Sequence, residues 1–204
     1  MTQNRLFLLF AALASLILSG CGSSPANQYY VLSAHSFSAS SDNAPSVGVG
    51  PIETPEYLSR ENMVLRSTKN YLEVSADSLW AEPLDSGIQR VLILNLAGQL
   101  KTQNVESFPW HPRRAPDYGV KVSVLTMDAN TQVATLTAEW LVYRPSDSKP
   151  VNRRISQLQR PLSSGTPAAE QVAEAYSDLL FQLSEIISAA IEDDLNQRTK
   201  STGA

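Results

Sequence analysis

The sequence is poor in the residue types that build metal centres and disulfide frameworks. Its 204 residues include one cysteine, Cys21, and two histidines, His35 and His111. A single cysteine cannot form an intrachain disulfide or a cysteine-rich zinc or iron–sulfur site, and two histidines supply too few ligands for most other metal centres. We therefore expect neither a bound metal nor a cofactor.

The chain also lacks an excess of positive charge. It has 16 lysines and arginines against 20 aspartates and glutamates, which gives a formal net charge of -4. A protein that holds nucleic acid needs a positive field to neutralise the phosphates. We therefore expect no nucleic acid partner.

Catalytic and nucleotide-binding motifs are missing as well. Neither His35, in a serine-rich segment, nor His111, between Trp110 and Pro112, accompanies a Gly-x-Ser-x-Gly segment or a paired-carboxylate motif. No glycine-rich loop of the kind that cradles phosphates is present. We expect the chain not to be an enzyme and not to bind or hydrolyse ATP.

The first twenty residues have the pattern of a secretory signal. Arg5 precedes an apolar run over residues 6–18 that only Ser15 interrupts. As a helix this run would cover about 20 Å, against a hydrocarbon core of about 30 Å. A permanent membrane span is therefore the weaker interpretation.

The apolar run ends in Leu18-Ser19-Gly20-Cys21, which resembles the bacterial lipobox. We expect cleavage between Gly20 and Cys21 and acylation of the Cys21 thiol, because the small residues let a peptidase hold an extended backbone. Two or three acyl chains anchor a protein far more firmly than one. The alternative is that Cys21 is an ordinary buried thiol.

The residue after the cysteine bears on the destination. Gly22 stands where an aspartate would resemble an inner-membrane retention signal, so we expect the periplasmic face of the outer membrane. From Cys21 to Asn27 the chain stretches about 25 Å at most, which would hold the domain close to the bilayer. Since the net charge is negative, the lipid anchor and not a basic surface must hold it at anionic lipids.

Hydrophobic periodicity predicts the elements of the remaining chain. Apolar and polar residues alternate over 118–124 and 136–142 with turn residues between them, which indicates a long antiparallel hairpin. Apolar residues spaced as one helix face predict helices over 84–100 and from Pro167, capped by Thr166, to Leu195. Further strands are predicted over residues 29–32, 47–52, 63–66, 71–74 and 153–160.

These elements indicate a single domain of the α+β class. We expect a mixed, largely antiparallel sheet with two main helices packed against it. The chain then divides into a lipoprotein signal peptide (1–20), a lipidated tether (21–28), the α+β domain (29–195) and a polar tail (196–204) that we expect to be frayed.

Three separated motifs resemble one family. They are Pro51-Ile52-Glu53-Thr54-Pro55-Glu56-Tyr57-Leu58-Ser59-Arg60, Trp80-Ala81-Glu82-Pro83-Leu84 and Tyr176-Ser177-Asp178-Leu179-Leu180. Together they are similar to the PqiC family of ABC-type transport auxiliary lipoproteins. The resemblance implies an outer-membrane lipoprotein that partners the periplasmic tunnel protein and, indirectly, the inner-membrane permease of an MCE-type lipid transport system. It also implies a fold similar to the N-terminal domain of TolB.

The motifs contain three candidates for partner contacts. Tyr57 and Arg60 lie in the first motif, and Trp80 opens the second. The alternative for Tyr57 and Arg60 is a purely architectural role, with Arg60 facing solvent or a carboxylate. The alternative for Trp80 is a place in the core, because aromatic side chains fill cores more often than they anchor partners.

The most unusual stretch is residues 108–116, in which three prolines stiffen a loop with two aromatic residues and two adjacent arginines. Arg113 and Arg114 are suited to phosphate, and Trp110 is suited to a surface that is apolar on one side and wet on the other. Such a loop is suited to dock a protein or a lipid headgroup. The alternative is a solvated connection.

The leading functional hypothesis is a non-enzymatic, lipid-anchored adaptor. It would hold the tunnel protein at the outer membrane, assist lipid passage and support envelope integrity. A closed homo-oligomeric ring would match a rotationally symmetric tunnel. The alternative is a periplasmic lipid-binding shuttle or chaperone with an apolar pocket between sheet and helices.

Overall fold

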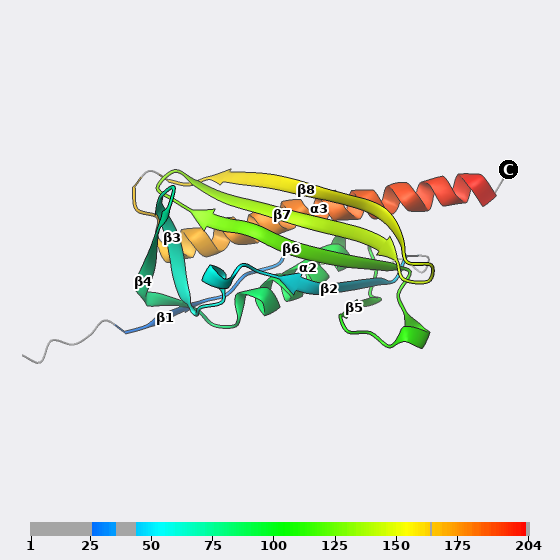
Figure 1. Ribbon diagram of the computed structural model, residues 1–204, viewed down its shortest axis with the longest axis horizontal. Coiled ribbons are helices and arrows are strands. Elements are labelled where there is room, and N and C mark those ends of the chain that lie inside the picture. Colours follow the sequence, from blue (N-terminus) through cyan, green and yellow to red (C-terminus); the bar gives the residue numbers. More distant parts are fainter. Residues whose placement is uncertain (1–25, 36–43, 164, 203–204) are drawn as a thin grey trace, which may run out of the picture.

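The computed structural model describes residues 26–35, 44–163 and 165–202 (Figure 1). The predicted signal peptide, the cleavage site at Gly20 and Cys21, and most of the tether lie outside these residues. Within the described residues, no helix is both long enough and apolar enough to cross a bilayer. The fold is α+β, as predicted.

The main sheet is mixed and has five strands in the order β5-β2-β6-β7-β8. Neighbours along β6, β7 and β8 are antiparallel, while β2 is parallel to both β5 and β6. The strands are β2 (Val47–Glu53), β5 (Val105–Ser107), β6 (Tyr118–Ala129), β7 (Val133–Arg144) and β8 (Lys149–Pro161). The predicted hairpin and the predicted strand after it are therefore confirmed, and β5 is an addition.

A smaller sheet of three strands, in the order β1-β4-β3, packs at one end of the molecule. Its strands are β1 (Gln28–Tyr30), β3 (Asn62–Thr68) and β4 (Tyr71–Trp80). The antiparallel pairing of β3 with β4 confirms the strands predicted over residues 63–66 and 71–74 and joins them in a hairpin. β1 is parallel to β4 and forms an edge of this sheet.

Two helices, α2 (Leu84–Gln99) and α3 (Ala169–Thr202), cover one face of the main sheet (Figure 1). Two short 3-10 turns, η1 (Glu56–Leu58) and η2 (Pro112–Arg114), lie in connections. Every second residue of β7 is buried, so one face of the main sheet is covered. The core lies between this face and the two helices. Its fully buried members include Trp140, Leu136, Ile88, Leu92, Leu179, Leu183 and Ile187.

Both ends of α3 differ from the prediction. The helix begins at Ala169 rather than at Pro167, because the carbonyl of Ala168 is the acceptor for the amide of Val172. Residues 196–202, expected to be a frayed tail, continue the helix. Arg198 lies close enough to the Tyr118 hydroxyl of β6 to oppose the rise of its pKa, so this last part of the helix lies beside the sheet.

The molecule has two distinct ends, which we call the β1 end and the η2 end. The β1 end contains β1, the β3–β4 hairpin and the start of α3 (Figure 1). The η2 end contains β5, η2, the β7–β8 turn and the last residues of α3. α3 connects the two ends and, with 34 residues, is about 50 Å long.

Candidate docking surfaces

The three separated motifs meet at one point of β6. The Tyr57 hydroxyl donates to Oδ1 of Asp128 at 3.1 Å and accepts from the amide of Met127 at 3.2 Å. Trp80 stacks on Tyr176 with ring centroids 6.1 Å apart, and the Tyr176 hydroxyl donates to the Met127 carbonyl. Burial raises the pKa of both tyrosines, so both hydroxyls remain donors. The motifs thus form an architectural joint.

This joint decides where the candidate contacts of the motifs lie. Trp80 is only 6% exposed, so it is a core residue, and its predicted partner contact is not available on the surface. Tyr57 is half-buried, and its hydroxyl is fully engaged in the joint. Arg60 is exposed. Of these three residues, only Arg60 has a side chain that is exposed and therefore accessible to a partner.

Residues 108–116, which we call the η2 loop, are fixed at both ends. The amide of Phe108 donates to the carbonyl of Val49 in β2 at 2.9 Å. At the other end, the amide and hydroxyl of Ser46 both donate to Oδ2 of Asp117, whose own amide donates to the Ser46 hydroxyl. Both ends of the loop are therefore hydrogen-bonded to β2 or to Ser46 just before it, and the residues between them project into solvent.

Trp110 of the η2 loop packs against a glycine, which leaves room for its ring. Its ring lies over Gly48 of β2, where an added Cβ would come within 2.6 Å of Trp110 Cε3 and 2.8 Å of Pro116 Cγ. Phe108 meets the Trp110 ring edge to face, with centroids 5.3 Å apart, and is 44% exposed. The accessible aromatic surface of the loop therefore belongs chiefly to Phe108.

A second glycine extends this aromatic surface across the sheet. Gly119 of β6 pairs with Gly48 in register, and the ring of Tyr143 from β7 covers it. Lys121 lies over that ring, 5.3 Å from its centroid. Nothing in the sequence except the two glycines themselves indicates that Trp110 and Tyr143 occupy neighbouring seats.

The cationic part of the η2 loop faces solvent. Arg113 and Arg114 are both exposed in η2, and within the described residues neither forms an ion pair. The amide of Arg113 donates to Nδ1 of His111 at 3.1 Å, which fixes the turn. A polar cavity of about 560 Å³ beside the turn is lined by Arg114, His111, Trp110 and Glu106 among others. The structure thus brings Trp110, Arg113 and Arg114 together on one projection.

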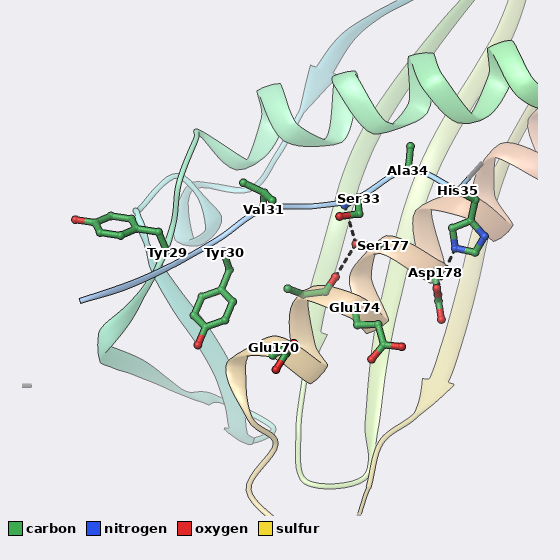
Figure 2. A pocket seen from close by; sticks show the side chains of 11 residues that line it. Tyr29, Tyr30, Val31, Ser33, Ala34, His35, Glu170, Glu174, Ser177 and Asp178 are labelled. Carbon is green, nitrogen blue, oxygen red and sulfur yellow. Dashed lines mark hydrogen bonds and ion pairs between the residues drawn. The ribbon is translucent and has the colours of Figure 1, made fainter. Parts of the chain in front are cut away.

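A groove with a volume of about 430 Å³ lies at the β1 end (Figure 2). One wall is the extended segment from Tyr29 to His35, and the other is the first part of α3. We call it the β1 groove. Figure 2 shows Glu170 and Glu174 on the helical wall. Tyr29, on the opposite wall, is 63% exposed.

The segment is fastened to both helices where the groove closes. The amide of Ser33 donates to Oγ of Ser177 in α3, and the amide of His35 donates to Oδ1 of Asn95 in α2, each at 3.0 Å. The His35 ring stacks on Phe181 with centroids 3.9 Å apart. These contacts seat residues 33–35 between the two helices.

The pairing of His35 with Asp178 resembles part of a catalytic triad, but the part of the chain that the structure describes places no free nucleophile beside it. His35 Nε2 lies 3.0 Å from Asp178 Oδ1. The neighbouring Ser177 hydroxyl donates to the carbonyl of Ala173 and accepts from the amide of Ser33, so His35 does not activate it. Among the described residues there is also no group of side chains that could hold a metal ion.

The sequence contains one signal for the helical wall of this groove. Glu170, Glu174 and Asp178 are spaced four residues apart, which places them on one face of a helix. Arg160 of β8 pairs with Glu174 at 3.1 Å and with Asp178 at 2.8 Å. The opposite wall could not be predicted, because it depends on a contact between segments more than a hundred residues apart.

Comparison with known proteins gives one family and consistent relatives. Residues 30–188 match the family described as "ABC-type transport auxiliary lipoprotein component". The chain is 30% identical over 101 residues to the intermembrane transport lipoprotein PqiC of Escherichia coli (strain K12). This alignment covers 48% of this chain and 54% of that protein. The same values hold for PqiC of Shigella flexneri. The chain thus matches about half the length of these relatives.

Solved structures share the fold. Protein XCC0632 from Xanthomonas campestris superposes with a TM-score of 0.66 at 18% identity, covering 84% of this chain and 99% of that one. An uncharacterized protein superposes with a TM-score of 0.63 at 19% identity, covering 82% and 99%. At such identities the likeness shows the fold alone.

Proposed function

Because the chain belongs to the PqiC family of ABC-type transport auxiliary lipoproteins, we propose that it docks the tunnel protein of an MCE-type lipid transport system at the outer membrane. Acyl chains on Cys21 hold the domain at the periplasmic face. The folded surface then holds the tip of the tunnel against the membrane, while an inner-membrane permease completes the pathway. The role is positional, and the family is not an enzyme class.

One observation carries this proposal: the η2 loop and β1 lie at opposite ends of the molecule (Figure 1). The tether enters at β1, and from Cys21 to Asn27 it spans at most about 25 Å. α3, which connects the two ends, is about twice that length. An upright domain therefore presents the η2 loop to the periplasm, where it meets a protein rather than lipid headgroups.

The chemistry of the η2 loop suits a protein partner. Exposed aromatic and arginine side chains are the residue types that most often anchor interfaces, and the loop offers Phe108, Arg113 and Arg114 together. Because the loop is pinned at both ends, binding costs little ordering of its backbone. The adjacent arginines favour an acidic patch on the tunnel protein.

The test is recovery of the MCE-domain tunnel protein from membranes in mild detergent. The triple variant Phe108→Ala, Arg113→Ala, Arg114→Ala removes the exposed groups and leaves Trp110 in its seat. We expect at least a tenfold loss of recovered tunnel protein. The control Lys69→Ala with Tyr71→Ala removes an exposed cation and an exposed aromatic at the β1 end and should recover the wild-type amount. Unchanged recovery with the triple variant would refute docking through this loop.

The alternative function, a lipid shuttle, is not favoured by the packing. The space between sheet and helices, where its pocket was expected, is filled by side chains such as Trp140, Leu92 and Leu183, each at most 1% exposed. An apolar hollow does occur between β3–β4 and the start of α3, lined by Met63 and Val172 among others. It lies beside the smaller sheet and not between the main sheet and the helices.

A further inference from the structure

The β1 groove has a free strand edge along one wall. Among the described residues, β1 has β4 on one side and no strand on the other. The amide of Ala81 donates to the carbonyl of Tyr30, so the backbone of Tyr30 faces β4. In an extended chain the neighbouring residues face the opposite way. The backbone groups of Tyr29 and Val31 therefore point into the groove.

Later residues of the same segment confirm this direction. Ser33 and His35, on the same side as Val31, donate their amides to side chains of the two helices. For Tyr29 and Val31, no other described residue serves as such a partner. Figure 2 shows the segment diverging from α3 toward Tyr29, where the groove opens. The edge is thus closed at residues 33–35 and open at residues 29–31.

The opposite wall of the groove is acidic. Glu170 is exposed and forms no ion pair within the described residues, and the Glu174 side chain is 64% exposed. Arg160 offsets only part of the charge of Glu174 and Asp178. Tyr29 and Tyr30 add aromatic faces on which a cation can rest. The groove is therefore complementary to an extended backbone that carries positively charged side chains.

We propose that the β1 groove binds an extended segment rich in lysine or arginine, which pairs with β1 as an added strand. Main-chain hydrogen bonds to Tyr29 and Val31 supply affinity, and Glu170 and Glu174 select basic side chains. The inference rests on the proposed function, which supplies the partner: a second contact of the transport machinery, at the β1 end.

The chain itself offers no such segment nearby. Residues 22–27 and 36–45 contain no lysine or arginine. The adjacent arginines Arg153 and Arg154 lie within β8, which is already paired with β7. The charge complementarity therefore points to another protein as the source of the strand.

The probe is a capped eight-residue peptide of alternating lysine and valine, labelled with a fluorophore. It is titrated with the full lipidated chain in a non-ionic detergent at constant salt, and binding is read by anisotropy. Two derivatives carry N-methyl groups on alternate residues, one set on each edge of the strand. We expect one methylated derivative to bind at least tenfold more weakly than the other, because only one edge can pair with β1.

The protein variant Glu170→Gln with Glu174→Gln should weaken binding about fivefold, since exposed ion pairs contribute about 0.5 kcal/mol each. The matched control Glu185→Gln with Glu192→Gln makes the same charge change on exposed residues of α3 outside the groove. It should leave binding unchanged.

Three results would overturn the inference. Equal binding of both methylated derivatives would show that no strand is added, and equal weakening by the control variant would show non-specific charge attraction. Self-association of the chain that the Glu170→Gln, Glu174→Gln variant abolishes would assign the groove to a second copy. Recovery of the tunnel protein through the η2 loop is measured separately, so failure here leaves the proposed docking function intact.

Discussion

Two glycines shape the η2 end at the scale of single residues. Gly48 and Gly119 lie opposite each other on β2 and β6, and each leaves room for an aromatic ring, Trp110 and Tyr143. Their role is steric: both have burial typical of a strand interior, where glycine otherwise costs stability. The position of Trp110 thus depends on the lack of a Cβ atom at Gly48.

Gly48→Ala should lower the free energy of unfolding by about 1 to 3 kcal/mol, because the new methyl group overlaps the Trp110 ring. In a Trp110→Ala background the cost should fall by at least about 0.5 kcal/mol, since the obstructing ring is gone. Urea denaturation of the four proteins of this cycle measures both values. An identical cost in both backgrounds would show that Trp110 does not occupy this seat.

Tyr118 joins the sheet to the last part of α3. Its hydroxyl donates to Oδ2 of Asp194 at 2.8 Å, and Arg144 pairs with the same carboxylate at 3.2 Å. Burial, reinforced by Asp194 and opposed by Arg198, raises the pKa of Tyr118 to about 12. The phenol is therefore a donor throughout the physiological range.

This pKa shift predicts a window of alkaline destabilisation. The unfolded chain loses the Tyr118 proton near pH 10, while the folded chain keeps it until about pH 12. The stability linked to this proton is thus complete below pH 10 and is lost as the pH rises toward 12. Unfolding free energies across this window should fall less steeply in Tyr118→Phe than in the wild type. Equal slopes would contradict the assignment.

At the scale of elements, the segment from Tyr29 to His35 depends on the helices for its position. Only two of its residues, Tyr29 and Tyr30, pair with β4. Beyond them, Arg90 donates to the carbonyl of Leu32 at 2.8 Å, and Glu82 holds the Arg90 guanidinium. Together with Ser177 and Asn95, these side chains replace a strand partner.

Removal of one fastening should loosen this segment. Ser177→Ala leaves the amide of Ser33 without its acceptor, and we expect the Ser33 amide to exchange with solvent about tenfold faster, equivalent to about 1.4 kcal/mol. Ser184→Ala is the matched control, because the Ser184 hydroxyl is also buried on α3 but bonds only to the carbonyl of Leu180. Hydrogen exchange resolved by residue distinguishes the two; similar acceleration in both would contradict the contact.

Elements with a strong periodic pattern could be predicted from the sequence, whereas the short strand β5 could not. The alternation over β6 and β7 reflects one buried face, and the spacing along α2 and α3 reflects one buried stripe. β5 has three residues and exists through its pairing with β2, which no local pattern encodes. The helical end of α3 was missed because its tie to Tyr118 is a long-range contact.

The candidate surfaces divide in the same way. The η2 loop could be found from its own prolines, aromatics and arginines, because the residue types that identify such a loop are contiguous in the sequence. The packing of Trp110 over Gly48 could not, since Gly48 lies in β2 and Trp110 lies in the loop after β5. The burial of Trp80 was the weighed alternative, and only the stack with Tyr176 decides it.

At the scale of the whole molecule, the separation of the two ends predicts an orientation at the membrane. A thiol label placed by Tyr71→Cys, at the β1 end, should be quenched by lipid-bound quenchers in vesicles that carry the full lipidated chain. A label placed by Arg113→Cys, at the η2 end, should be quenched at least severalfold less, because α3 separates the ends by about 50 Å. Equal quenching would indicate a domain that lies flat on the bilayer.

The fastening of residues 29–35 also determines how mechanical load enters the molecule. Any pull between a membrane anchor and a docked tunnel first reaches β1, whose pairing with β4 is only three residues long. The load then passes to α2 through Arg90 and Asn95 and to α3 through Ser177. Because α3 runs the length of the domain to the η2 end, it can carry this pulling load along its axis, so that less of the load passes through the main sheet.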